Sequence, residues 1–354
     1  MKKILIIVFT VCLIACNLFS SYAQDQSLIT EDDLVKVLID GKYIKFVHKP
    51  IIVDYATLFP LYETLKALGV QNDESHIIWN SADKSITVKK NDLVITFYIG
   101  STKAMINGKE SSISNAPVQY KSQIYIPIRF IAESFGKEVI WDESISTMVI
   151  CDGNEHDKMK EICSKVEAAM MNIKKFKRVV TSTSIDKQGR KFSIIYYLEY
   201  DYLKKKKYWR SDSGSIIMEE YDIGDMNYSR QINFTKRMKW SKEKSETDYR
   251  SGIRYFGNSF IEALNLKDNI MENEYILEGC TIENANEFVE LIKRTNVVYT
   301  KIFIDKDTFL VKEDYSRLIT QVPVNYRLHK CESSTRYFDM NGDFEIEIPS
   351  DLKH

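Results

Sequence analysis

The sequence predicts an α+β protein in two parts: an N-terminal tandem repeat of hairpin–strand–helix–hairpin units, and a C-terminal curved antiparallel sheet, a half-barrel, with helices. Three observations predict it. A proline followed by helix-spaced apolar residues and a glycine occurs twice in the first half, one long amphipathic stretch follows residue 150, and alternating segments typical of strands fill the rest. A chain of 354 residues is long enough for two such parts to bury their own cores.

The N-terminal residues have the pattern of a secretory signal peptide, which we assign to residues 1–23. Lys2-Lys3 precedes an apolar run from Ile4 to Ala15, and the small residues around Tyr22 predict cleavage after Ala23. The run is too short for a membrane-spanning helix, and no second long apolar run follows. We therefore expect an exported protein, extracellular or at the cell surface and peripheral to the membrane.

Cys16 leaves an alternative open. Leu13-Ile14-Ala15-Cys16 resembles a bacterial lipobox, in which Cys16 would be lipidated and become the first residue of the mature chain. Lipidation would anchor the protein to the outer face of a membrane. With simple cleavage, Cys16 is apolar filler of the leader.

Net charge and cysteine spacing exclude two classes of function. The net charge of −1 argues against a nucleic-acid-binding protein, which would carry a basic excess. Beyond the leader the cysteines are Cys151, Cys163, Cys280 and Cys331. Export permits disulfides, but four cysteines allow three pairings, and buried free thiols stay an equal alternative. Since no C-x-x-C spacing is present, we predict no metal site from the cysteines.

The first half repeats itself with an offset of 67 residues. The offset aligns Gly41 with Gly108, Pro50 with Pro117, Pro60 with Pro127, and Gly69 with Gly136. Asp40-Gly41 and Asn107-Gly108 suit two-residue hairpin turns. A proline just before a helix removes no hydrogen bond from it, because the first amides of a helix have no partner within the helix. A glycine after the helix can adopt the left-handed backbone conformation that ends it.

Apolar residues at helical spacing follow each of these prolines and predict a buried stripe. They are Leu61, Leu65 and Leu68 in the first copy, and Ile128, Ile131 and Phe135 in the second. One copy has a small core, so we expect the two copies to pack together. Glu63 and Glu133 should face solvent. Trp79 and Trp141 occupy equivalent positions, which favours core packing, with ligand stacking as the alternative.

These motifs resemble the copper amine oxidase-like N-terminal domain found in exported proteins of Gram-positive bacteria. The resemblance covers about residues 35–150, and the second copy, "IYIPIRFIAESFGKEVIWD", is the closer one. The first copy departs at Phe59-Pro60-Leu61-Tyr62, which lacks the family's arginine. The resemblance implies a stalk or adhesion module that carries neither copper nor quinone.

Oxidase chemistry is not expected anywhere in the chain. The five histidines, His48, His76, His156, His329 and His354, are far apart, and no His-x-His occurs. Asn227-Tyr228-Ser229 lacks the acidic residue of a quinone-forming tyrosine site. We therefore predict no enzyme, no catalytic or metal-binding residue and no cofactor.

The second half begins after a polar stretch, Cys151 to Asn154, that predicts a break between domains. A helix follows with Met159, Ile162, Cys163, Val166, Met170, Ile173 and Phe176 on one face. Alternating segments then predict a large antiparallel sheet, interrupted by helical patches near Asn258–Leu266 and 285–294. We assign residues 155–354 to this domain.

This order resembles the LolA-like lipoprotein-carrier fold. The segments that carry the resemblance are "YDIGDMNYSRQINFTKRMKW", "KIFIDKDTFLVKED" and "NGDFEIEIPSDL". It implies that Phe, Ile, Met and Tyr side chains line a hollow for an acyl chain or a lipoprotein, without naming individual ligand-binding residues.

Three further groups have a structural and a functional interpretation. Tyr196, Tyr197, Tyr200, Tyr202 and Tyr208 are expected to pack the sheet, or else to form a ligand surface. The run Lys204–Lys207 predicts a solvated turn or a charged edge strand, or else a contact with anionic wall polymer or lipid headgroups. Asp339, Asn341 and Asp343 predict a hairpin turn rather than a calcium loop.

Together these observations predict an exported, non-catalytic envelope protein. A stalk or adhesion module would be joined to a domain that binds a lipid, lipoprotein or other apolar ligand. The alternative is an interaction protein that binds another protein or a cell-wall glycan without an internal cavity. The sequence does not identify the ligand or the oligomeric state.

Overall fold

The computed structural model describes residues 29–185, 188–246, 261–284, 295–322 and 330–352. The predicted leader, with Cys16 and Ala23, and the predicted helical patch at 285–294 lie outside the described residues. The described chain forms two compact units, one of residues 29–33 and 46–135, the other of residues 34–45 and 136–352. Within the described ranges, no helix is long and apolar enough to cross a membrane.

The first unit contains two five-stranded antiparallel sheets and two short helices. The sheet orders are β1-β4-β5-β12-β11 and β10-β9-β8-β7-β6. The first sheet consists of β1 (Thr30–Glu31), β4 (Ile51–Val53), β5 (Ala56–Pro60), β12 (Gln123–Ile126) and β11 (Val118–Tyr120). The second consists of β10 (Lys109–Ser112), β9 (Lys103–Ile106), β8 (Leu93–Tyr98), β7 (Ser85–Lys90) and β6 (Ile77–Asn80).

Both short helices begin after a proline and end before a glycine, as predicted. Helix α2 (Leu61–Ala67) follows Pro60, and α3 (Ile128–Ser134) follows Pro127. Gly69 and Gly136 have φ of +82° and +74°, the left-handed backbone that a side chain would strain. The predicted stripe is buried at Leu61, Leu65, Leu68, Ile128 and Ile131, while Phe135 is only half-buried.

The two copies of the repeat share one sheet. Strand β5 of the first copy pairs with β12 of the second, so that Phe59 lies opposite Ile126. Leu58, Phe59 and Ile126 are each at most 1% exposed. The expectation that two small cores pack together is therefore met at this strand pair.

A four-stranded sheet of the second unit also joins the two copies. Its order is β13 (Lys137–Asp142), β14 (Thr147–Asp152), β2 (Lys36–Ile39), β3 (Lys42–Tyr43), and β14 runs parallel to β2. The first hairpin of copy one and the last hairpin of copy two thus belong to the same unit as the C-terminal sheet. The boundaries 35–150 and 155–354, drawn from the repeat, stay a prediction.

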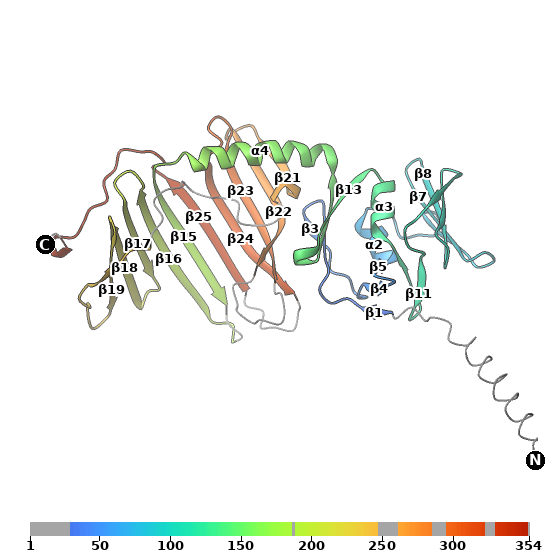
Figure 1. Cartoon of the computed structure of the whole chain (residues 1–354), viewed down its shortest axis with the longest axis horizontal. Helices are drawn as coiled ribbons and strands as arrows, with labels where there is room; N and C mark the ends of the chain where they lie inside the picture. The colour runs from blue at the N-terminus through green and yellow to red at the C-terminus, as the bar shows by residue number, and fades with distance from the viewer. Residues whose placement is uncertain (1–28, 186–187, 247–260, 285–294, 323–329, 353–354) are drawn as a thin grey trace, which may run out of the picture. The chain divides into compact units, whose positions relative to one another are not determined.

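The second unit is dominated by an 11-stranded antiparallel sheet, a half-barrel (Figure 1). Its order is β20-β19-β18-β17-β16-β15-β25-β24-β23-β22-β21. In chain order the strands are β15 (Lys175–Ile185), β16 (Lys191–Asp201), β17 (Lys206–Asp212), β18 (Ile216–Ile223), β19 (Met226–Asn233), β20 (Ser241–Lys244), β21 (Asn265–Asn269), β22 (Glu274–Asn284), β23 (Thr295–Asp305), β24 (Val311–Val322) and β25 (Lys330–Phe338).

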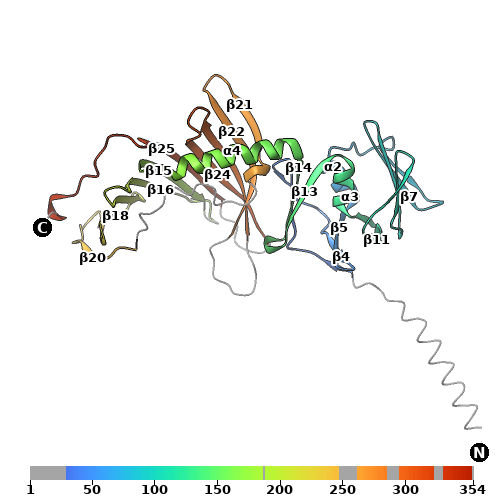
Figure 2. The ribbon, with the colours of Figure 1, turned by 45° about the horizontal axis from the view of Figure 1, so that its top comes forward.

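Helix α4 (Gly153–Met171) crosses the middle strands of this sheet (Figures 1 and 2). Its predicted apolar face is buried throughout, and Ile173 and Phe176 continue the contact into β15. The helix packs on Leu277 of β22, Ile302 of β23 and Tyr337 of β25. This packing forms the larger core of the unit.

The break predicted at Cys151 to Asn154 is not a linker. Strand β14 ends at Asp152 and α4 begins at Gly153. The Asp152 carboxylate accepts hydrogen bonds from the Asn154 and Glu155 amides, which caps the helix. Polar residues at this junction therefore mark the start of a helix, and a domain boundary at this point stays a prediction.

Other elements differ from the sequence-based expectation. Among the described residues the α-helices are α2, α3 and α4, so the chain is mostly β and the α+β expectation holds only in part. The patch predicted at Asn258–Leu266 contains a 3₁₀ turn, η2 (Ile261–Ala263), and β21 follows it directly. Two further 3₁₀ turns are η1 (Glu143–Ile145) and η3 (Ser350–Leu352).

The core-packing prediction for Trp79 and Trp141 is wrong. Their side chains are 45% and 40% exposed. Both do lie at equivalent positions, Trp79 in β6 and Trp141 in β13, and each of these strands is the last in its sheet. A side chain on an edge strand lacks a neighbour on one side, which accounts for the exposure.

Candidate functional site

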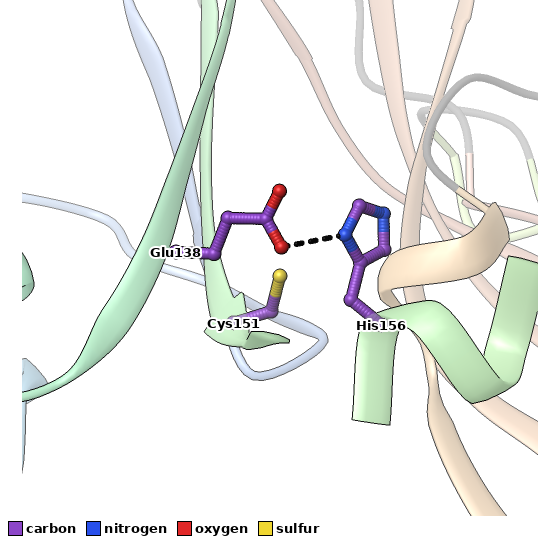
Figure 3. A group of neighbouring side chains, drawn as sticks. All are labelled: Glu138, Cys151 and His156. Atoms are coloured by element: carbon purple, nitrogen blue, oxygen red, sulfur yellow. Dashed lines mark hydrogen bonds and ion pairs between the residues drawn. The ribbon is translucent and has the colours of Figure 1, made fainter. Parts of the chain in front are cut away.

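Three side chains of metal-ligand type converge where β13, β14 and α4 meet. They are Glu138, Cys151 and His156, and their ligand atoms lie within 4.8 Å of one another. Figure 3 shows all three directed toward a common point from three different elements. Cys151 and His156 are buried, whereas the Glu138 side chain is 40% exposed.

The backbone explains the convergence. Glu138 and Cys151 are direct cross-strand partners in the β13–β14 hairpin, so their side chains leave the sheet on the same face. His156 follows in the first turn of α4, whose start is held by the Asp152 cap. Because hairpin pairing and helix start are both fixed, the three side chains keep a defined spacing.

A histidine–carboxylate hydrogen bond and a protonated thiol define the electrostatics of this group. His156 Nδ1 lies 2.9 Å from Glu138 Oε2. Burial, helped by the carboxylates of Glu138 and Asp40, raises the pKa of Cys151 to about 11. The thiol is therefore neutral at physiological pH and is not an activated nucleophile.

The spacing in the sequence does not reveal this group. Glu138, Cys151 and His156 become neighbours only once the hairpin register and the first turn of α4 are known. The available signal was the Trp141 hairpin itself, because its turn near Glu143 places residue 138 opposite residue 151.

A second feature is an apolar patch on the half-barrel. The strand pairing puts six side chains of β16, β17 and β18 on the sheet face that α4 covers further along. They are Phe192, Ile194, Tyr196, Trp209, Ile216 and Met218. Phe192, Ile216 and Met218 are 52%, 41% and 46% exposed, and the rings of Tyr196 and Trp209 lie 6.1 Å apart.

The predicted tyrosines divide between packing and this patch. Tyr200 stacks on Phe176 at 5.6 Å and contacts the tilted ring of Tyr202 at 4.4 Å, against the core under α4. Tyr208 contacts Tyr221 at 4.7 Å, whereas Tyr197 is 38% exposed. Sheet packing is thus confirmed for Tyr200, Tyr202 and Tyr208, and Tyr196 belongs to the apolar patch.

The lysine run is only partly a solvated turn. Lys204 and Lys205 are exposed in the turn before β17, and Lys204 pairs with Glu345. The edge-strand interpretation is wrong, because β17 lies between β16 and β18. Lys207 is half-buried, 2.8 Å from Asp222 and 2.6 Å from Glu220, so it is already paired within the sheet.

The two repeat glutamates differ from each other. Glu133 is exposed and pairs with Arg129, as a solvent-facing residue would. Glu63 instead accepts hydrogen bonds from the amides of Val47 and His48 and lies 2.6 Å from His48 Nδ1. It therefore fixes the connection before β4.

The remaining predicted residues have structural positions. Cys151, Cys163, Cys280 and Cys331 are all free, which settles the open choice between thiols and disulfides. Asp339, Asn341 and Asp343 form a turn in which Asn341 Oδ1 accepts the Lys174 amide. No strand follows in residues 339–352, so the predicted hairpin is wrong.

Comparison with known proteins gives likenesses for both halves. No curated protein matches the sequence. A LolA superfamily protein from Nitrosomonas europaea is similar at 8% identity and a TM-score of 0.23, over 55% of this chain and 96% of its own. An outer membrane lipoprotein-sorting protein domain from Vibrio parahaemolyticus is similar at 9% identity and 0.24, over 56% and 97%.

A DUF1329 family protein from Desulfovibrio piger is similar at 11% identity and a TM-score of 0.20, over 55% of this chain and 94% of its own. The half-barrel is defined by its own strand order. Residues 38–150 match the family model of the copper amine oxidase N-terminal domain, as the doubled motif predicts.

Proposed function

We propose that this is a non-catalytic envelope protein whose half-barrel binds the acyl chain of an anionic amphiphile, a lipid or lipoprotein. The observation that carries the proposal is the apolar patch of Phe192, Ile194, Tyr196, Trp209, Ile216 and Met218. Single exposed apolar side chains are common, but six apolar side chains gathered on one sheet face, with Ser211 of β17 between Tyr196 and Met218, mark a candidate binding surface.

The patch continues the core that α4 covers. Leu198 and Tyr200 of β16 pack beneath the helix, and Tyr196, Ile194 and Phe192 follow on the same face of the same strand. Beyond the helix this face is half-buried and then exposed. A long apolar chain lying along β16 to β18 would bury the part that α4 leaves open.

The position of the patch favours an acyl chain over a peptide strand. A peptide that binds by β-augmentation needs a free sheet edge. Here β16, β17 and β18 are interior strands, and each has its hydrogen-bonding partners on both sides. Only the face of the sheet is available there, and this face suits an apolar ligand.

A cation at the end of the patch favours an anionic headgroup. The Arg190 guanidinium lies 5.9 Å from the Phe192 ring, and Arg190 is exposed. An amphiphile with its chain on the patch would place its headgroup beside this charge. The N-terminal repeat would then serve as the stalk or adhesion module of an exported protein.

Quenching of Trp209 by a brominated fatty acid tests the proposal. Bromine quenches indole fluorescence on contact, so the wild-type protein should show saturable quenching. Trp209→Phe should lose most of it, and the control Trp141→Phe, which removes an exposed Trp outside the patch, should keep it. Met218→Lys should weaken binding at least about tenfold, since it places a charge in the apolar contact.

Absence of saturable quenching in the wild type, or equal quenching in Trp209→Phe, would reject the acyl-binding proposal. The protein- or glycan-binding alternative would then be preferred.

A further inference from the structure

We infer that Glu138, Cys151 and His156 form a binding site for a divalent transition metal of the zinc class. This inference is independent of the apolar patch and of what binds there. It rests on the kinds of donor atom, their spacing and their access to solvent.

The donor set selects the class of metal. A thiolate sulfur, an imidazole nitrogen and a carboxylate oxygen are the three ligand types that Zn²⁺ takes in proteins. Calcium and magnesium prefer oxygen ligands alone, so a site containing Cys151 and His156 discriminates against both.

The spacing requires only a small closure. Ligand atoms on one tetrahedral zinc lie about 3.5 Å apart, since each is about 2.0–2.3 Å from the metal. The three ligand atoms here lie within 4.8 Å of one another. Side-chain rotations that move each ligand atom by about 1 Å would bring all three within bonding distance of one metal ion, without movement of β13, β14 or α4.

Two of the three ligands are shielded from solvent, and the third gives a metal ion access to the site. Cys151 and His156 are each 5% exposed, and the hairpin and the helix hold their backbones. The Glu138 side chain is 40% exposed, so the site opens to solvent on that side. Three protein ligands leave a fourth position for water or for an external ligand.

Binding exchanges protons in a defined way. The Cys151 thiol releases its proton to solvent as sulfur bonds the metal. The hydrogen bond between His156 Nδ1 and Glu138 breaks. The neutral imidazole then carries its proton on Nε2, and Nδ1 bonds the metal. The Glu138 carboxylate, freed from the imidazole, becomes the oxygen ligand.

Cobalt(II) binding to the metal-free protein tests the site. Cobalt replaces zinc in such sites, and a cobalt–thiolate bond gives a near-ultraviolet charge-transfer band. We expect one equivalent of Co²⁺ per chain with this band, and displacement of the cobalt by Zn²⁺. Cys151→Ser should abolish the band, whereas Cys163→Ser, which alters a buried thiol of α4 outside the site, should retain it.

Glu138→Gln provides a second variant. Because the side chain at position 138 is 40% exposed, this substitution should leave the fold intact. It should keep the charge-transfer band but bind Zn²⁺ at least about tenfold more weakly, because a charged ligand is lost. Circular dichroism confirms folding of each variant. If wild-type protein shows no thiolate band, or if Glu138→Gln binds zinc with unchanged affinity, the inference is wrong.

Discussion

Arg230 shows how single residues of the sheet accommodate charge. Its side chain is 4% exposed, with Nη2 2.6 Å from Glu219 and the guanidinium 4.0 Å from the Trp240 ring. Asp351 of the C-terminal segment lies 3.4 Å from Nη1 and also accepts the Trp240 indole N–H. A planar guanidinium can pair with a carboxylate and stack on a ring at once, which lysine cannot do.

Arg230→Ala should therefore cost about 3 kcal/mol of unfolding free energy, because it removes the closest cation from the largely buried Glu219 carboxylate and the contact with the Trp240 ring. Arg336→Ala is the control, since Arg336 is 71% exposed beside Glu313 and should cost less than about 1 kcal/mol. Urea titrations of both variants measure the difference. Equal destabilisation would show that the Arg230 contacts contribute no more than a surface pair.

Single residues were also the hardest to place from the sequence. Lys207 belongs to a run of four lysines that is typical of a solvated turn, yet it pairs with Asp222, a residue 1% exposed. Only the register of β17 against β18 brings the two together, and spacing along the chain does not contain that register. The Glu138, Cys151 and His156 group escaped prediction for the same reason.

At the level of elements, the sequence predicts helices correctly where single residues mark their ends. Prolines, glycines and the 3.6-residue period predicted α2, α3 and α4 with the correct buried faces. Equivalent positions in a repeat predict the same environment for Trp79 and Trp141 but not which environment it is, and both side chains are exposed rather than in the core. The segment Phe344–Pro349 alternates like a strand but runs as irregular chain, and the partners of Phe344 and Glu345 are lysine side chains rather than the backbone of a neighbouring strand.

The cap of α4 gives a test at this scale. Asp152→Ala removes the acceptor of two amide hydrogen bonds and should cost about 1 kcal/mol. Asp157→Ala, in the same helix, alters only an exposed pair with Lys160 and should change stability by less than about 0.5 kcal/mol. Thermal melts followed by circular dichroism compare the two. Equal destabilisation by the two substitutions would mean that the Asp152 cap does not hold the first turn of α4, and with it His156, in place.

At the level of the whole molecule, the C-terminal segment ties the end of the chain to the large sheet. Lys175 donates to the Phe344 carbonyl, Lys204 pairs with Glu345, and Ile346 is 4% exposed. The segment therefore contributes to the core although it contains no strand.

Ile346→Ala should cost about 2 kcal/mol, the lower end for emptying a buried aliphatic site. Glu347→Ala changes the adjacent exposed position and should be nearly neutral. Chemical unfolding of the full chain measures both. A neutral Ile346→Ala would mean that the segment lies on the sheet without stabilising it.

The parallel pairing of β14 with β2 has a consequence for how the protein is made. The hairpin of β2 and β3 is among the first described segments to leave the ribosome or a translocation channel, yet its partner begins at Thr147. Residues 46–135 must be synthesised in between, and closing so long a loop carries an entropic cost before any contact offsets it. Val37, Leu38 and Ile39 therefore have β3 beside them but lack β14 on their other side until residues 147–150 have been made, so one edge of this short apolar strand stays open in the meantime.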